Sequence, residues 1–241
     1  MRIIVVDNYE EMSKKAALMV ASQVTLKPDS VLGLATGDTP LGMYEELVKL
    51  YNKQEVDFKE VRTFNLDEYY GLDPENPQSY YSYMTRNLFN KVDISKNNIN
   101  MPDGMAKDVN ASCVLYESKI KTLGGIDMQV LGIGGNGHIG FNEPNVNFEA
   151  QTHLVNLDEQ TIEANSRFFK SIEEVPVKAI SMGIKTIMNS KKIILLANGL
   201  NKAEVIEKAV NGKINPSIPA SILQLHNDVT IIIDKEAASL L

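Results

Sequence analysis

The stretch Val31-Leu-Gly-Leu-Ala-Thr-Gly-Asp-Thr-Pro40 joins a short apolar run to an amphipathic segment that continues to Asn52. An apolar run of this length, followed by a turn and a longer amphipathic stretch, is typical of a buried strand that leads into a helix. Thr39 is a suitable N-cap, and Pro40 suits the first helical turn. The stretch therefore predicts a strand, a tight turn and a helix, the repeating unit of a parallel sheet.

The same unit recurs along the whole chain. Eight short strands rich in β-branched or aliphatic residues are predicted at 2–6, 31–35, 61–66, 128–133, 152–157, 179–183, 192–197 and 229–233. Helices are predicted at 9–24, 41–52, 77–89, 109–123, 158–169, 202–210 and, as a short one, 216–224. No stretch between them has the length of an interdomain linker, so we expect one α/β domain over residues 1–241 with a mostly parallel open sheet.

Composition excludes several classes of protein. A chain of 241 residues with 44% hydrophobic content buries a core unaided. The net charge of -7 disfavours nucleic-acid binding, and the single cysteine, Cys113, excludes an internal disulfide and leaves little support for a cysteine-based zinc site. The longest aliphatic runs are far shorter than a membrane helix, and the N-terminus lacks the apolar core of a signal peptide, so we expect a cytoplasmic protein without a membrane span.

The turn at residues 36–40 is a candidate anion site, because ligands of open parallel sheets bind at the carboxyl ends of the strands. Gly37 lets the backbone turn its N–H groups toward a ligand, and the helix that follows adds a positive field. Two basic residues, Arg167 and Lys202, lie at the ends of other predicted helices and are able to complete a phosphate site. An ordinary turn and two solvated surface charges remain the alternative.

The third predicted strand runs into Asn65-Leu-Asp-Glu-Tyr69. Side chains alternate along a strand, so only one of the adjacent carboxylates Asp67 and Glu68 can face a given ligand. A carboxylate at a strand end is a candidate general base. A solvated acidic turn is the other interpretation.

The richest segment is Leu131-Gly-Ile-Gly-Gly-Asn-Gly-His-Ile-Gly-Phe-Asn-Glu-Pro144. Its glycine spacing matches a dinucleotide fingerprint, but Gly140 and Pro144 interrupt the helix that a fingerprint requires. The glycines indicate close approach of the backbone to a ligand. His138 is a candidate acid or base, with Glu143 to orient its ring, and the alternative is a buried structural histidine. His153 and His226 are expected to be structural, and no metal motif occurs.

Three segments together resemble the glucosamine-6-phosphate deaminase family: Leu34-Ala-Thr-Gly-Asp-Thr-Pro40, Phe64-Asn-Leu-Asp-Glu-Tyr69 and Gly132-Ile-Gly-Gly-Asn-Gly-His-Ile-Gly-Phe-Asn-Glu-Pro144. Similarity continues in Ser79-Tyr-Tyr-Ser82, Asn165-Ser-Arg-Phe-Phe169 and Leu223-Gln-Leu-His226, so it extends over nearly the entire chain. The resemblance implies a modified Rossmann-like sheet with helices on both faces. It also implies an enzyme without a cofactor that converts glucosamine 6-phosphate into fructose 6-phosphate and ammonia in amino-sugar catabolism.

The resemblance assigns roles to individual residues. Asp67 moves a proton between C2 and C1 of the sugar, and His138, supported by Glu143, opens the pyranose ring. The phosphate would be held by Thr36, Gly37, Thr39, Arg167 and Lys202. Asn136 occupies a position where some family members have aspartate, so Glu143 is expected to support the histidine alone.

Two other functions compete with the deaminase. A 6-phosphogluconolactonase shares the scaffold and the phosphate loop, but Glu143 and Tyr69 match the deaminase pattern better. A sugar-phosphate sensor of a transcriptional regulator would carry a DNA-binding module ahead of this domain, whereas the first strand is predicted at Arg2. The chain is also shorter than the hexameric, allosterically activated branch of the family, so we expect no activation by N-acetylglucosamine 6-phosphate and a monomer, with a small homo-oligomer as the alternative.

Overall fold

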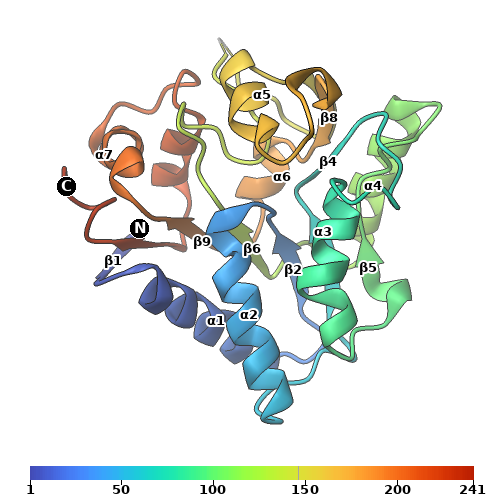
Figure 1. Ribbon diagram of the computed structural model, residues 1–241. Helices are drawn as coiled ribbons and strands as arrows, with labels where there is room; N and C mark the ends of the chain where they lie inside the picture. The colour runs from blue at the N-terminus through green and yellow to red at the C-terminus, as the bar shows by residue number, and fades with distance from the viewer. Residues whose placement is uncertain (146) are drawn as a thin grey trace.

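A computed structural model describes residues 1–145 and 147–241 (Figure 1). Its centre is a seven-stranded sheet in the order β1-β10-β9-β6-β2-β3-β5, and every neighbouring pair is parallel. The strands are β1 (Arg2–Val6), β2 (Val31–Leu34), β3 (Arg62–Asn65), β5 (Ile99–Asn100), β6 (Met128–Leu131), β9 (Lys192–Ala197) and β10 (Val229–Asp234). The predicted α/β fold with a mostly parallel sheet is confirmed.

Helices cover both faces of this sheet. The α-helices are α1 (Tyr9–Leu26), α2 (Asp38–Asn52), α3 (Tyr80–Asn87), α4 (Val109–Thr122), α5 (Glu159–Ser166), α6 (Ile184–Met188) and α7 (Ala203–Asn211). Short 3-10 helices are η1 (Phe89–Lys91), η2 (Lys96–Asn98), η3 (Ile172–Glu174), η4 (Leu200–Lys202) and η5 (Pro219–Leu225). In two hydrophobic clusters, α1, α2 and α3 pack on one face of the sheet and α4, α6 and α7 on the other.

The alternation of side chains along each strand produces these two clusters. On β9, Ile194 and Leu196 point to the α1 side, while Ile193 and Leu195 point to the α4 side, and all four are at most 1% exposed. Strands that are apolar on both faces are required in a sheet with helices on both sides. The continuous apolar run at 193–197 is therefore the sequence signal of a central strand.

Two predicted strands do not join this sheet. The structure places β7 (His153–Asn156) and β8 (Lys178–Ser181) with β4 (Asp67–Tyr69) in a separate antiparallel sheet of order β4-β8-β7. The interpretation of 152–157 and 179–183 as parallel strands was wrong. Alternate residues of β7 are exposed, which is typical of an antiparallel sheet with one solvated face.

This second sheet and α5 lie over the carboxyl ends of the central strands (Figure 1). A third, small hydrophobic cluster joins β4 and β8 to α5, and it contains Tyr69, Phe141, Leu157 and Ala179. The two sheets meet where the chain leaves β3 and enters β4, because Leu66 donates its N–H to Leu34 of the large sheet and accepts from Met182. The second sheet thus covers one side of the carboxyl ends of the central strands, where ligands are predicted to bind.

Candidate active site

A cleft of about 350 Å³ opens at the carboxyl ends of β2, β3 and β6. It is lined by residues of six segments that lie apart in the sequence, at 35–40, 66–67, 80, 132–141, 160–165 and 202. Those predicted for the site are Thr36, Gly37, Thr39, Asp67, Asn136, His138 and Lys202. Two predicted residues, Glu143 and Arg167, do not line this cleft but contact residues that do. The volume lies within the range of small-molecule sites.

One end of the cleft is the N-terminus of α2. Gly37 is the N-cap, with φ of 103°, and no side chain caps the helix. The carbonyl of Gly37 accepts a hydrogen bond from Tyr83 Oη at 2.6 Å, and that of Asp38 accepts from Tyr9 Oη at 2.8 Å. Because these carbonyls are turned into the protein and the first-turn N–H groups have no side-chain cap, the end of α2 is suited to an anion.

The prediction of Thr39 as the N-cap was wrong. The helix begins at Asp38, one residue before Thr39, because glycine at position 37 adopts a backbone conformation that other residues rarely take. A side-chain cap would use N–H groups that the glycine leaves available to a ligand. Thr39 therefore lies in the first turn and lines the cleft.

The two predicted basic residues occupy different positions. Lys202 lines the cleft, and its Nζ donates to the carbonyl of Ile133 at 2.8 Å. Burial, and then the nearby charge of Arg167, lower the pKa of Lys202. Arg167 follows α5 directly, stacks on Phe168 and pairs with Asp38 Oδ2 at 2.7 Å. Its side chain is 63% exposed, so Arg167 lies at the rim of the cleft.

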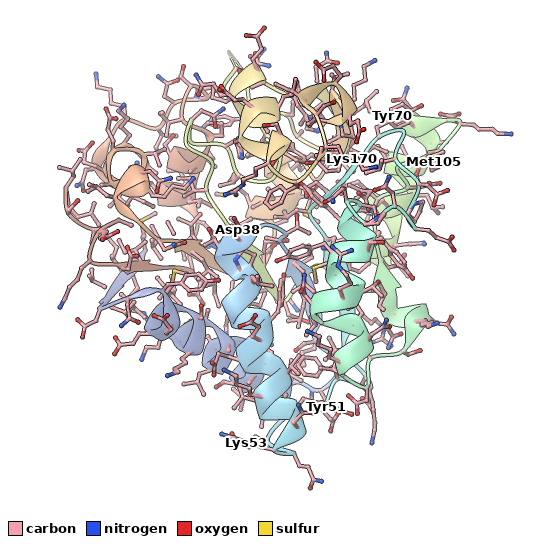
Figure 2. The ribbon with its side chains drawn as sticks, in the orientation of Figure 1. Asp38, Tyr51, Lys53, Tyr70, Met105 and Lys170 are labelled. Carbon is pink, nitrogen blue, oxygen red and sulfur yellow. The ribbon has the colours of Figure 1, made fainter. Side chains whose placement is uncertain are left out.

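Figure 2 labels Asp38, the residue of α2 that pairs with Arg167. Asp38 is at the end of α2 beneath α5, opposite the end that carries Tyr51 and Lys53. The Arg167–Asp38 pair thus joins α5 to the anion end of the cleft. An anionic ligand bound there would compete with Asp38 for the guanidinium, which forms bidentate contacts with phosphate.

Asp67 is the buried carboxylate of the cleft. It is the first residue of β4 and only 6% exposed. Burial, followed by the charge of Glu68, raises the pKa of Asp67 to about 8. A carboxyl group with such a pKa is suited to exchange protons with a ligand near neutral pH.

Glu68 points away from the cleft, as the alternation along a strand predicts. Its carboxylate accepts hydrogen bonds from the N–H groups of Tyr69, Tyr80 and Tyr81, each at 2.9 Å. It therefore anchors the start of α3, from which Tyr80 reaches the cleft. Asp67 thus faces the cleft, while Glu68 stabilises the start of α3 beside it.

His138 and Glu143 form a hydrogen-bonded pair within the glycine-rich segment. His138 Nδ1 lies 3.1 Å from Glu143 Oε2, and Asn136 Nδ2 donates to the same oxygen at 2.8 Å. Burial acts to raise the pKa of Glu143, but the bond and charge of His138 and the bonds from Thr161 and Asn136 outweigh it and lower the pKa to about 2. An ionised carboxylate only accepts, so we assign the proton of the pair to Nδ1. In the neutral ring, Nε2 is then left as the acceptor.

The glycines place this pair beside Asp67. A Cβ on Gly134 would lie 2.4 Å from the ring of His138, so the ring packs directly on the backbone there. Gly140 has φ of 56°, and a Cβ on it would lie 3.6 Å from Asp67 Oδ2. The residues that directly follow β6 form turns and no helix, and the next helix among the described residues is α5 at Glu159. The segment thus lacks the helix that a dinucleotide fingerprint opens into.

Two residues of the site were missed by the sequence analysis. Thr161 donates to Glu143 Oε1 at 2.7 Å, and Tyr80 lines the cleft, where its hydroxyl interacts with Thr36. Each lies on a helix that only the tertiary fold brings to the cleft. The segments quoted at 79–82 and 165–169 run close to them, but no local spacing distinguishes them.

The remaining candidates lie elsewhere. His226 is buried and bonds the carbonyl of Ser190 at 2.7 Å, and His153 bonds the carbonyl of Gln151 at 2.9 Å. Cys113 is buried. Across residues 1–145 and 147–241, no group of three His, Cys, Asp or Glu side chains is arranged to hold a metal ion. Within the same ranges, no helix has the length and apolar character required to cross a bilayer.

Known proteins resemble this chain over its whole length. The family of glucosamine-6-phosphate isomerases and 6-phosphogluconolactonases matches residues 7–232. A glucosamine-6-phosphate deaminase of Clostridium botulinum is 72% identical over 239 residues, which are 99% of this chain and 98% of the relative. The solved structure of a monomeric glucosamine-6-phosphate deaminase superposes with a TM-score of 0.98 at 48% identity, over 100% of both chains.

The other branch of the family is more distant. A 6-phosphogluconolactonase from Trypanosoma cruzi has a TM-score of 0.78 at 21% identity, over 100% of this chain and 96% of its own. That similarity extends to the fold alone. With the family matched over most of its length and a relative 72% identical, the chain belongs to the family of glucosamine-6-phosphate isomerases and 6-phosphogluconolactonases.

Proposed function

We propose that this protein is a glucosamine-6-phosphate deaminase. One observation carries the proposal: Asp67 and His138, the partner of Glu143, open onto a single cleft that ends at the uncapped N-terminus of α2. A phosphate bound at that end holds the sugar remotely, so that its binding energy orients C1 and C2 against the side-chain catalysts. Proteins named for this activity are 72% and 48% identical to the chain.

The proposed reaction begins with ring opening. His138, with Nδ1 held by Glu143, takes the proton of the anomeric hydroxyl at Nε2 and returns a proton to the ring oxygen. The C1–O5 bond breaks and an aldehyde forms at C1. Glu143 stabilises the transient imidazolium and fixes the tautomer.

Asp67 performs the second stage. Its carboxylate takes the proton from C2, giving an enolamine with a C1–C2 double bond, and delivers the proton to C1. O1 gains a proton and the amino nitrogen loses one, so that the C1 aldehyde becomes a hydroxymethyl group and the C2 amine becomes an imine. Water adds to this imine and ammonia leaves, giving fructose 6-phosphate. Because C1 is reduced while C2 is oxidised, the net reaction is redox-neutral, in keeping with the expectation that no cofactor takes part.

The phosphate site is part of the proposal. Thr36, Gly37 and Thr39 line the cleft at the start of α2, and Lys202 lies in the same cleft. Arg167 would exchange its partner Asp38 for the phosphate. Asn136 is proposed to support Glu143 through its amide, in place of an additional carboxylate.

We further propose that the chain acts as one domain over residues 1–241, as a monomer, in the cytoplasm and without nucleic acid. The solved deaminase that superposes on this chain over the full length of both is described as monomeric. A phosphorylated sugar crosses a bilayer poorly because of its charge. We therefore expect the enzyme in the compartment where the sugar is phosphorylated.

The direct test is ammonia release from glucosamine 6-phosphate by the purified protein, with 6-phosphogluconolactone supplied in parallel. We expect ammonia and fructose 6-phosphate in equal amounts and no hydrolysis of the lactone above background. Lactone hydrolysis without ammonia would favour the lactonase, and binding of either compound without turnover would favour a sensor.

The raised pKa of Asp67 predicts the pH dependence of the reaction. Below about pH 8 the free enzyme carries Asp67 mainly protonated, and the protonated form accepts no proton from C2. We expect kcat/KM to rise with pH from 6 and to level off above about 8, because this ratio reports the groups of the free enzyme.

Glu68→Gln serves as the control for this assignment. The charge of Glu68 contributes to the raised pKa of Asp67, so its removal should move the rise in kcat/KM to lower pH. Burial is the larger cause of the raised pKa and remains in this variant, so we expect a partial shift. A rise at an unchanged pH would mean that the group that titrates does not sense the charge of Glu68. A flat profile between pH 6 and 9 would contradict the role of Asp67.

Replacement of Glu143 by Gln is expected to lower kcat at least about tenfold, because an amide binds the imidazolium of His138 more weakly than a carboxylate. Initial rates of ammonia release at saturating substrate measure this effect. Glu204→Gln, at an exposed position of α7 where the glutamate pairs with Lys208, is the matched control and should leave kcat within about twofold. An unchanged kcat in the Glu143 variant would remove this residue from the mechanism.

A further inference from the structure

Thr161 is a buried hydroxyl that the ring-opening chemistry above does not use. It lies on α5, is 6% exposed, and donates its Oγ1 proton to Glu143 Oε1 at 2.7 Å. The two residues are 18 positions apart, so this bond belongs to the tertiary structure. It is the contact through which α5 reaches the His138–Glu143 pair.

The bond completes the hydrogen-bonding of Glu143. Oε2 accepts from His138 and Asn136, and Oε1 accepts from Thr161. The last torsion of a glutamate side chain is broad and weakly restrained, so bonds to one oxygen alone leave the plane of the carboxylate poorly fixed. The side chain of Glu143 is only 10% exposed, which limits the ability of water to replace a lost donor.

Helix α5 also belongs to the cleft. Thr161 and its neighbours Gln160, Ala164 and Asn165 line it. The helix ends at Ser166, and the next residue, Arg167, pairs with Asp38 at the start of α2. Thr161 is therefore on an element that contacts both the anion end of the cleft and the acid–base pair. A displacement of α5 would withdraw the donor from Oε1.

We propose that Thr161 is a positioning residue for ring opening: its hydroxyl holds Glu143, and through it His138, in the orientation that the proton transfer requires. Ring opening then depends on α5 being packed against the cleft. The inference rests on the proposed function, and it adds a residue that acts on the rate through its bond to Glu143.

Thr161→Val tests the inference, because it keeps the branched shape and removes the hydroxyl. We expect kcat for ammonia release to fall about tenfold, while KM stays within about twofold because the phosphate site is unchanged. Thr161→Ser restores the donor and should recover kcat to within about threefold of the wild type. Thr161→Ala, which also lacks the donor, should behave like the valine variant.

The chain offers a close control. Thr186 is also 6% exposed and also donates to a glutamate, Glu117 Oε1, at 2.7 Å, but neither residue lines the cleft. Thr186→Val removes a buried hydroxyl of the same kind and should leave kcat within about twofold. An equal loss of kcat in both valine variants would mean a general effect of the lost hydroxyl on the fold and would overturn the proposal.

A double-mutant cycle separates positioning from packing. If Thr161 acts through Glu143, Thr161→Val causes no further loss of kcat in a Glu143→Gln background. An independent tenfold loss in that background would overturn the proposal, as would a wild-type rate in Thr161→Val or failure of the serine variant to recover. If wild-type protein releases no ammonia, the proposed function fails before these variants are compared.

Discussion

Asp67→Asn is expected to abolish ammonia release, with kcat reduced at least about a thousandfold. The amide occupies the same volume but accepts no proton from C2, and general base catalysis contributes about 10²–10⁴-fold to such reactions. Asp29→Asn, at an exposed position ahead of β2, is the control and should leave the rate unchanged. Ammonia release at more than a tenth of the wild-type rate in Asp67→Asn would show that another group is the base.

The same variant should be more stable than the wild type near neutral pH. Asp67 has a pKa near 8 in the folded protein and an ordinary value near 3.8. Between these values the folded state holds a proton that the unfolded state releases, so the free energy of unfolding is highest below about pH 4 and falls as pH rises toward 8. The slope is about 1.4 kcal/mol per pH unit for one such group.

Urea unfolding at pH 5, 6 and 7 measures this linkage. The free energy of unfolding of the wild type should fall with pH more steeply than that of Asp67→Asn. Parallel pH dependences would mean that Asp67 is ionised in the folded protein. Loss of activity together with gain of stability is the signature of a buried catalytic carboxylate, because burial raises the pKa that catalysis uses and at the same time costs folding free energy.

His138→Gln is expected to lower kcat about 100- to 1000-fold. Glutamine can still reach Glu143, but it neither takes nor returns a proton during ring opening. The measurement is ammonia release at saturating glucosamine 6-phosphate, together with inhibition by 2-amino-2-deoxyglucitol 6-phosphate, an open-chain analogue that has no ring to open. The inhibition constant should stay within about threefold.

His153→Gln is the matched control, since the ring of His153 bonds the Gln151 carbonyl away from the cleft. It should retain the wild-type rate. If His138→Gln weakened the open-chain analogue as strongly as it slowed turnover, the histidine would bind the sugar instead of opening the ring.

Six of the seven strands of the large sheet could be predicted because each of the six carries its own signal, and β5 is the exception. Central strands such as β9 and β10 are apolar on both faces, which is the pattern of a strand with helices on both sides. The segments at 152–157 and 179–183 have strand propensity too, but propensity does not specify a partner. The three-residue β4 and two-residue β5 are too short to have a signal of their own.

The residues of the site also differ in how far the sequence predicts them. Asp67, His138 and Glu143 lie in segments whose composition is unusual, and His138 and Glu143 are five residues apart, so one turn brings them together. Thr161 is 18 residues from Glu143 on a helix that looks ordinary. Its position depends on how α5 packs beside the second sheet, and the sequence analysis placed neither that sheet nor its strand partners correctly.

Carbon NMR of the reaction with glucosamine 6-phosphate labelled with ¹³C at C1 and C2 follows both reacting carbons. We expect C1 to change from a hemiacetal to a hydroxymethyl carbon, C2 to become the anomeric carbon of a ketose, and one ammonia to form per sugar. A C1 that remains a hemiacetal in the presence of the purified protein would contradict the proposed deaminase reaction.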